Sequence, residues 1–153
     1  MLELRDLSTG YGGRPVVHGV NLEVGHCDEQ IVFTLDWTLI KRVLANLVSN
    51  AIKHSAPQST VTLFCNYVEN TPECAGYLEL SVSDKGEGIA EQDQKRIFEK
   101  FAQASQRTRG SRMDTGLGLT FCKLATEANG GKIELKSALG TGSTFTLVFP
   151  ASV

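Results

Sequence analysis

The chain has 153 residues, a formal net charge of −2 and 41% hydrophobic residues. This length suffices for one hydrophobic core and not for two, so we expect a single compact domain. The 15 basic and 17 acidic residues are nearly balanced, which excludes a strongly basic surface for nucleic acid. There is no run of about 18 apolar residues, and no apolar leader follows Met1. The composition therefore predicts a soluble, cytoplasmic chain that contacts neither nucleic acid nor membrane directly.

The four cysteines, Cys27, Cys65, Cys74 and Cys122, show no spacing typical of a metal site. Cys65 falls within a predicted strand and Cys122 within a predicted helix, where a thiol behaves as a small apolar side chain. We therefore interpret the cysteines as reduced cytosolic thiols rather than as disulfides or metal ligands.

The N-terminal part of the chain has the weakest structural pattern. The segment Gly10-Tyr-Gly-Gly13 interrupts any helix there. We interpret residues 1–19 as the remnant of a linker from an upstream domain and residues 20–153 as the domain itself. Short strands are predicted near Val20–Val24 and Gln30–Leu35.

An amphipathic helix is predicted from Thr38 to His54. Asn46, Asn50 and Lys53 lie at i, i+4 and i+7, on one stripe beside its apolar face. Two carboxamides and an ammonium group can supply an oxygen ligand for Mg²⁺ and a positive charge for phosphate. For this helix alone, solvation of an exposed face explains the same residues equally well. Its apolar residues recur at three- and four-residue spacing and are Ile40, Val43, Leu44, Leu47, Val48 and Ala51.

Two strands are predicted at Thr60–Val68 and Tyr77–Ser83. In the second, apolar residues alternate from Leu78 to Val82, and Asp84 has the same parity just beyond the strand. A carboxylate on the apolar side of a sheet needs a hydrogen-bond donor. The exocyclic amine of adenine is a suitable donor.

Asp84 is followed by Gly86, Gly88 and Ile89. The glycines would let the backbone approach a flat ligand, and Ile89 would cover its aromatic face. The Asp-x-Gly-x-Gly spacing also occurs in ordinary turns, so its meaning depends on the neighbouring motifs.

The next predicted elements are a short helix at Glu91–Ile97, a polar loop from Phe101 to Thr115 and a second helix that opens at Gly116. The loop has no apolar periodicity and is interpreted as mobile. Free N–H groups and the dipole at the start of the second helix attract anions, so phosphate is the expected ligand there. The predicted apolar stripe of this helix contains Leu117, Phe121, Leu124, Ala125 and Ala128.

Two final strands, Lys132–Ser137 and Thr144–Phe149, are joined by a Gly140-Thr-Gly142 turn. The chain contains neither a P-loop nor a dinucleotide-binding motif. The order of the elements predicts an α+β fold, a two-layer α/β sandwich with a mixed sheet and helices on one face.

Five segments in this order resemble the sequence boxes of one protein family. The resemblance covers about Val20 to Pro150 and is to the catalytic, ATP-binding domain of sensor histidine kinases. These kinases belong to the GHKL superfamily, shared with gyrase, mismatch-repair and heat-shock ATPases. The matching segments are Asn46–Ser55 (N box), Asp84–Ile89 (G1 box), Arg96–Phe101 (F box), Thr115–Leu119 (G2 box) and Gly140–Ser143 (final glycine box).

The resemblance implies a Bergerat-type ATP-binding fold with ATP and Mg²⁺ as cofactors. Asn50 would ligate Mg²⁺, Lys53 would contact phosphate, and Gln103 in an ATP lid would complete the catalytic set. Asp84 would bind the adenine amine. The nucleotide-binding residues that it implies are Asn46, Asn50, Lys53, His54, Asp84, Gly86, Gly88, Ile89, Phe101, Thr115, Gly116, Leu117, Gly118, Leu119 and Ser143.

The resemblance also implies a reaction. ATPases of the superfamily commonly carry a glutamate four residues before the metal-binding asparagine, whereas this chain has Asn46 there, an amide that cannot act as a general base. None of His18, His26 and His54 stands in a phosphoacceptor context. The implied reaction is therefore transfer of the terminal phosphoryl group of ATP to a histidine on a separate dimerisation and histidine-phosphotransfer domain. A response regulator would be the indirect partner, and the parent protein would be either cytoplasmic or membrane-anchored.

One residue departs from the family pattern. Asp114 stands where the G2 box commonly has glycine, which places a carboxylate near the expected phosphates. Three alternatives therefore stay open: a nucleotide-binding regulatory module from a degenerate kinase, a serine kinase of the anti-sigma type, and an ATPase. The F box and Gln103 favour the histidine kinase over the serine kinase, and Asn46 disfavours the ATPase.

Overall fold

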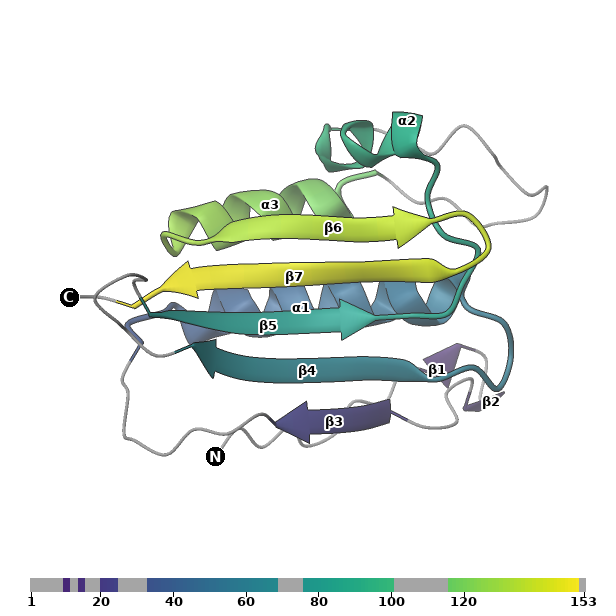
Figure 1. Ribbon diagram of the computed structural model, residues 1–153, viewed down its shortest axis with the longest axis horizontal. Coiled ribbons are helices and arrows are strands. Elements are labelled where there is room, and N and C mark those ends of the chain that lie inside the picture. The colour runs from purple at the N-terminus through teal and green to yellow at the C-terminus, as the bar shows by residue number, and fades with distance from the viewer. Residues whose placement is uncertain are drawn as a thin grey trace.

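The computed structural model describes residues 33–68, 76–100 and 116–151 in full, and the backbone of three further short strands. The elements in chain order are β1 (Gly10–Tyr11), β2 (Arg14–Pro15), β3 (Val20–Val24), α1 (Trp37–His54), β4 (Val61–Val68), β5 (Tyr77–Ser83), α2 (Glu91–Gln94), the 3-10 helix η1 (Arg96–Phe98), α3 (Gly118–Ala128), β6 (Lys132–Ala138) and β7 (Gly142–Pro150). The long strands form one layer, and α1 and α3 lie together behind it (Figure 1).

The main sheet has five strands in the order β3-β4-β5-β7-β6. β3 pairs with β4 in parallel, and the other neighbouring strands are antiparallel. β1 and β2 pair with each other in a separate antiparallel ribbon. The mixed sheet with helices on one face confirms the predicted α+β two-layer sandwich (Figure 1).

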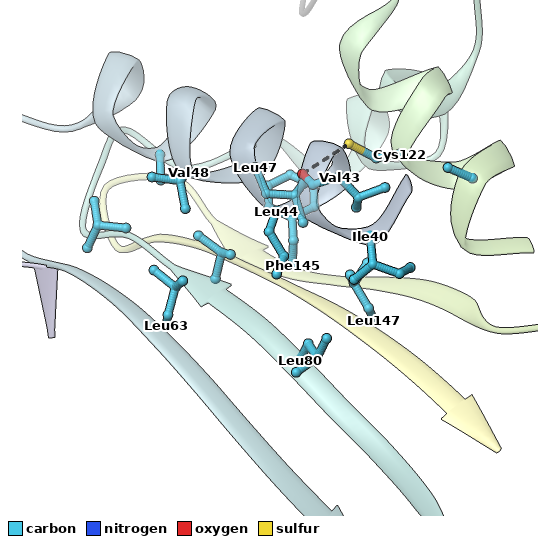
Figure 2. Packing of buried hydrophobic residues seen from close by; sticks show 14 of the residues in the cluster. Ile40, Val43, Leu44, Leu47, Val48, Leu63, Leu80, Cys122, Phe145 and Leu147 are labelled. Atoms are coloured by element: carbon cyan, nitrogen blue, oxygen red, sulfur yellow. Dashed lines mark hydrogen bonds between the residues drawn. The ribbon is translucent and has the colours of Figure 1, made fainter. Parts of the chain in front are cut away.

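Helix α1 begins at Trp37 and ends at the predicted His54. The Asp36 side chain caps its start, because Oδ1 accepts hydrogen bonds from the backbone N–H of Thr38 at 2.9 Å and of Leu39 at 3.1 Å. The buried residues of α1 are those predicted from the spacing, namely Ile40, Val43, Leu44, Leu47, Val48 and Ala51. They form one core with residues of the sheet that include Leu63, Leu80, Phe145 and Leu147 (Figure 2).

Helix α3 buries a different face from the predicted one. Leu117 and Leu124 are 42% and 54% exposed, and Ala128 is exposed as well. The predicted apolar stripe is therefore wrong at these three positions. The residues of α3 that are buried are Thr120, Cys122, Ala125 and Thr126.

Small and polar residues are buried here because α3 packs against α1. Thr126 Oγ1 donates to the carbonyl oxygen of Cys122 at 2.7 Å, and Cys122 Sγ donates to the carbonyl oxygen of Val43 on α1 at 3.7 Å (Figure 2). A hydroxyl or thiol with a hydrogen-bond partner can be buried at little cost, and it takes less room than leucine between two helices. In the same contact, the guanidinium of Arg42 lies 4.9 Å from the ring centroid of Phe121.

The predicted strand Gln30–Leu35 is wrong over its described part, since residues 33–35 belong to no strand. Residues 30–32 lie outside the described residues. Phe33 packs edge-on against Tyr67, with ring centroids 5.7 Å apart, and Leu35 packs against the core. The apolar residues 33 and 35 therefore contribute side-chain packing just before α1 rather than pairing in the sheet.

The predicted helix Glu91–Ile97 is divided between α2 and η1, and β4 to β7 lie close to their predicted bounds. Phe98, a residue of the F box, packs edge-on against Phe145 of the core at 6.2 Å between ring centroids. The polar loop Phe101–Thr115 lies outside the described residues. No helix in the described ranges is long and apolar enough to cross a bilayer.

Candidate functional site

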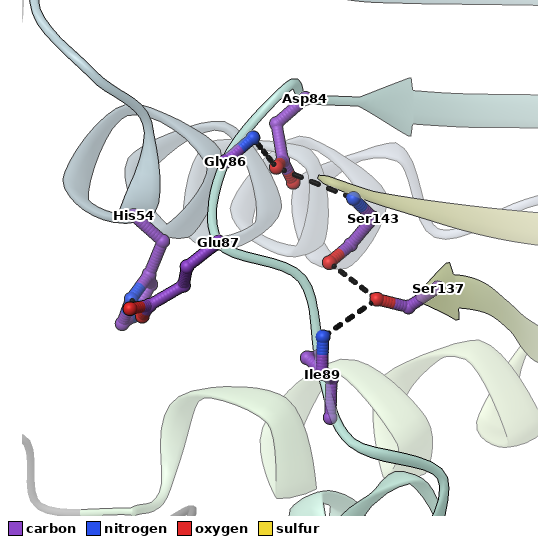
Figure 3. Close-up of polar contacts among 7 residues, drawn as sticks. All are labelled: His54, Asp84, Gly86, Glu87, Ile89, Ser137 and Ser143. Carbon is purple, nitrogen blue, oxygen red and sulfur yellow. Dashed lines mark hydrogen bonds and ion pairs between the residues drawn. The ribbon is translucent and has the colours of Figure 1, made fainter. Parts of the chain in front are cut away.

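Asp84 lies at the end of β5 and is 8% exposed. Its backbone N–H donates to the carbonyl oxygen of Ser143 at 2.9 Å, which extends the β5–β7 ladder by one residue. Its Oδ1 accepts hydrogen bonds from the backbone N–H groups of Gly86 at 2.8 Å and Ser143 at 3.3 Å (Figure 3). Oδ2 takes part in no hydrogen bond with the described residues. The predicted burial of this carboxylate is confirmed, and the chain itself supplies part of the hydrogen bonding that the carboxylate needs.

The residues after Asp84 form a loop, residues 84–90, that lies against the C-terminal end of α1. A Cβ at Gly86 would overlap the carbonyl oxygen of His54. The backbone N–H of Glu87 donates to the same carbonyl oxygen at 3.4 Å. The last carbonyls of a helix have no partner within the helix, so the 84–90 loop supplies one.

The other side of this loop contacts the turn between β6 and β7. Gly88 has a φ of +71°, and a Cβ there would overlap the carbonyl oxygen of Ala138. The backbone N–H of Gly140 donates to the carbonyl oxygen of Glu87 at 2.8 Å. Glycine is therefore required at these positions by the close approach of other backbone of the same chain, and contact of the glycines with a flat ligand stays a prediction.

His54 is paired with a residue of the loop. Its Nδ1 lies 2.9 Å from Oε1 of Glu87, and the two side chains are 47% and 60% exposed (Figure 3). An exposed pair of this kind contributes little to stability. It nevertheless links the N-box helix to the G1 box, which the sequence did not indicate.

One residue of the predicted polar stripe of α1, Asn46, lies near the start of α3. Asn46 is half-buried, and its Oδ1 lies 3.8 Å from where a Cβ of Gly118 would be. Asn50 is half-buried too, and Lys53 is exposed. The carboxamides of Asn46 and Asn50 make no side-chain hydrogen bond with the part of the chain that the structure describes.

Helix α3 begins at Gly118, after Gly116 with a φ of +64°. Leu117 occupies the N-cap position and makes no side-chain hydrogen bond to the helix start. Backbone N–H groups at such a start favour a bound anion. Leu119 packs partly against the core. Phe101, Gln103, Asp114 and Thr115 lie outside the described residues.

Ser143, a predicted site residue, is paired with Ser137 on β6, a hydroxyl that sequence reasoning missed. The Oγ atoms of Ser137 and Ser143 lie 3.0 Å apart, and the backbone N–H of Ile89 donates to Ser137 Oγ at 2.8 Å (Figure 3). Ser137 belongs to none of the five sequence boxes. The available signal was its parity with Ile133 and Leu135, which places a hydroxyl on the apolar face of the strand.

The structure therefore brings parts of four predicted boxes together: the N box, the G1 box, the G2 box and the final glycine box. The 84–90 loop contacts the end of α1 and the β6–β7 turn, and Asn46 lies next to the start of α3. Within the described residues, no group of three His, Cys, Asp or Glu side chains could hold a metal ion. An amide oxygen can serve Mg²⁺ here only with other oxygen ligands, as is usual for Mg²⁺ bound to a nucleotide phosphate.

Comparison with known proteins agrees with the resemblance carried by the sequence boxes. Residues 35–153 match the family described as histidine kinase-, DNA gyrase B-, and HSP90-like ATPase. The sensor protein SrrB of Staphylococcus aureus (strain MRSA252) is 36% identical over 133 residues, which are 86% of this chain and 21% of SrrB. The chain thus spans only a minor part of that relative.

Three solved structures are also similar to this chain. The mycobacterial sensor histidine kinase MprB has a TM-score of 0.65 at 25% identity, covering 86% of this chain and 81% of that one. Full-length ShkA, solved in complex with AMPPNP, has a TM-score of 0.66 at 26% identity, covering 88% of this chain and 26% of ShkA. The catalytic domain of histidine kinase ThkA has a TM-score of 0.65 at 27% identity over 86% of this chain and 79% of that one. The chain belongs to the histidine kinase-, DNA gyrase B- and HSP90-like ATPase family, and two of the similar structures, MprB and ThkA, are those of histidine kinases.

Proposed function

We propose that this domain binds Mg-ATP and donates the terminal phosphoryl group to a histidine on a separate dimerisation and phosphoacceptor domain. The observation that carries the proposal is the Asp84 carboxylate. It is buried, one oxygen is held by two backbone amides, and the other accepts no hydrogen bond from the described residues. A buried carboxylate oxygen is a strong acceptor for an amino group such as that of adenine.

The proposed roles of the other site residues follow from their positions in the chain and the fold. Asn50 supplies an amide oxygen for Mg²⁺, Lys53 supplies a positive charge for phosphate, and the N–H groups at the start of α3 favour the same anion. Bound Mg²⁺ would neutralise charge on the phosphate oxygens and orient them. Gln103 would contact the terminal phosphate from the lid, as in the resembling family.

The phosphoryl group would move by an in-line displacement. The bond between the terminal phosphorus and the ADP oxygen breaks as an imidazole nitrogen forms a bond to that phosphorus, so the domain supplies positioning and electrostatic stabilisation. Asn46 cannot activate water as a base, which disfavours hydrolysis. None of His18, His26 and His54 stands in a phosphoacceptor context, so the acceptor histidine belongs to a partner domain, and a response regulator receives the group afterwards.

The proposal places the domain in the cytoplasm, where ATP is available, with its parent protein free or membrane-anchored. Asp114 favours a second candidate, a regulatory module that binds nucleotide without transferring phosphate, because its carboxylate would stand near the phosphates. Phosphotransfer to a supplied acceptor domain separates the two candidates.

Asp84→Asn tests the proposal most directly. The amide keeps one oxygen for the N–H groups of Gly86 and Ser143 and replaces the other with a donor, which cannot accept the adenine amine. Loss of this hydrogen bond should cost about 1.5–3 kcal/mol, or roughly ten- to a hundred-fold in affinity for ADP by calorimetry.

Glu91→Gln is a matched control for charge, because Glu91 is exposed on α2. Its affinity for ADP should equal that of the wild type. Wild-type affinity in Asp84→Asn would remove Asp84 from the site, and absence of ADP binding in the wild-type domain would refute the proposed function.

A further inference from the structure

Gln94, the last residue of α2, makes a double contact that no motif predicts. Its Nε2 donates to the carbonyl oxygen of Ile89 at 3.0 Å and to that of Ser137 at 2.9 Å. Both hydrogens of the carboxamide are therefore used, one on the 84–90 loop and one on β6. Gln94 joins the loop to the sheet.

Ser137 completes this arrangement from the other side. Its Oγ donates to the carbonyl oxygen of Gly142 at 2.9 Å and accepts from the N–H of Ile89. A hydroxyl has one hydrogen and two acceptor sites. Since the hydrogen of Ser137 goes to Gly142, Ser143 must be the donor in the contact between the two hydroxyls (Figure 3). Every hydrogen-bonding position of the Ser137 hydroxyl is then filled.

The result is that the backbone of Ile89 is held at both of its polar groups. Its N–H is bonded to Ser137 and its carbonyl oxygen to Gln94. The other end of the 84–90 loop is held by Ser143, whose N–H donates to Asp84. The loop is thus held at both ends, and within it the N–H of Gly86 also donates to the Asp84 carboxylate.

We propose that Gln94 and Ser137 are positioning residues for base recognition: by clamping Ile89 they hold the 84–90 loop so that Asp84 can bind the amine of adenine. The inference rests on the proposed function for the identity of the ligand. It implies that α2, which precedes the F box, helps the site to recognise the base.

Gln94→Glu is the sharpest variant. The carboxylate has almost the same shape but directs an acceptor at two carbonyl oxygens, so the clamp opens. Gln92→Glu is the matched control, because Gln92 is exposed on the same helix and adds the same charge. Ser137→Ala removes the bond to the N–H of Ile89 from the opposite side.

The readout is the ratio of affinities for ADP and inosine diphosphate, which lacks the amine. The wild type and Gln92→Glu should prefer ADP by about tenfold or more, whereas Gln94→Glu and Ser137→Ala should lose most of this preference. A residue that only stabilised the fold would change both affinities alike and leave the ratio intact. An unchanged ratio in both clamp variants would overturn the inference.

A second measurement needs no ligand. Hydrogen exchange of the Ile89 amide should be slow in the wild type and in Gln92→Glu, and at least about tenfold faster in Ser137→Ala, while amides of β5 keep their protection. Equal exchange at Ile89 would refute the clamp even if nucleotide binds as proposed. A protected Ile89 in a wild-type domain that binds neither nucleotide would instead refute the proposed function, and the role in base recognition with it.

Discussion

Gly88 and Gly130 have nearly the same backbone conformation, with φ values of +71° and +72°. A Cβ at Gly88 would overlap the carbonyl oxygen of Ala138, whereas no atom of the described residues lies within 4 Å of a Cβ at Gly130. Both positions carry the cost of a left-handed conformation for any other residue. Comparing substitutions at the two positions therefore separates the effect of the close approach between the 84–90 loop and the β6–β7 turn from the effect of backbone conformation.

Alanine at the two positions should therefore have unequal effects. Gly130→Ala should lower the free energy of unfolding by about 1–2 kcal/mol through the backbone conformation alone. Gly88→Ala should cost about 1–3 kcal/mol more, because the methyl group forces the loop and turn apart. Urea denaturation of the three proteins measures both values, and equal losses would contradict the contact at Ala138.

Individual residues of the site differ in how far the sequence could predict them. The burial of Asp84 followed from the parity of a single strand, which is local information. The partners of Gly86 and Gly88 lie on α1 and on the β6–β7 turn, and no local pattern reveals such contacts. The same holds for Gln94, whose two carbonyl partners come from different elements.

α1 and α3 also differ in how far the sequence could predict their buried residues. α1 could be predicted with all of its buried residues, because its buried side consists of apolar residues at helical spacing. α3 could not, because Cys122 and Thr126 are buried in place of Leu124. Their hydrogen bonds offset the cost of burying a thiol and a hydroxyl. A pattern of apolar residues does not reveal these hydrogen bonds.

Cys122 makes the contact of α3 with α1 sensitive to alkali. The thiol is fully buried, and burial raises its pKa from 9.0 to about 12. Above pH 9 the unfolded chain therefore loses a proton that the folded chain keeps. The free energy of unfolding should fall by up to about 1.4 kcal/mol per pH unit between the two pKa values, and it should be unaffected by this group below pH 9.

Cys122→Ser tests this, because the hydroxyl does not ionise and can keep the bond to the carbonyl oxygen of Val43. Between pH 8 and pH 11 the wild type should lose stability more steeply than the variant, and denaturation at several pH values compares the two slopes. The other titrating groups are common to both proteins and cancel in the difference. Parallel slopes would show that the thiol ionises as readily in the folded state as in the unfolded one.

In the whole molecule, segments far apart in the chain meet at one end of the sheet. Pairing of β5 with β7 places Asp84 beside Ser143, and packing of α1 against α3 places Asn46 beside Gly118. The proposed base reader and the proposed metal ligand therefore stand on separate elements. Removing Asn50 should impair phosphoryl transfer without removing the contact that Asp84 makes with the base.

The last prediction concerns the domain as a catalyst. Incubated alone with labelled ATP, the chain should neither label itself appreciably nor hydrolyse ATP quickly, since none of its three histidines stands in a phosphoacceptor context and Asn46 cannot activate water. Addition of a cognate dimerisation and histidine-phosphotransfer domain should produce an acid-labile, alkali-stable phosphoryl group on that partner. Asn50→Ala should abolish this transfer while it retains most of the affinity for ADP. Robust self-labelling, or steady hydrolysis without a partner, would exclude the proposed division of labour and favour an ATPase.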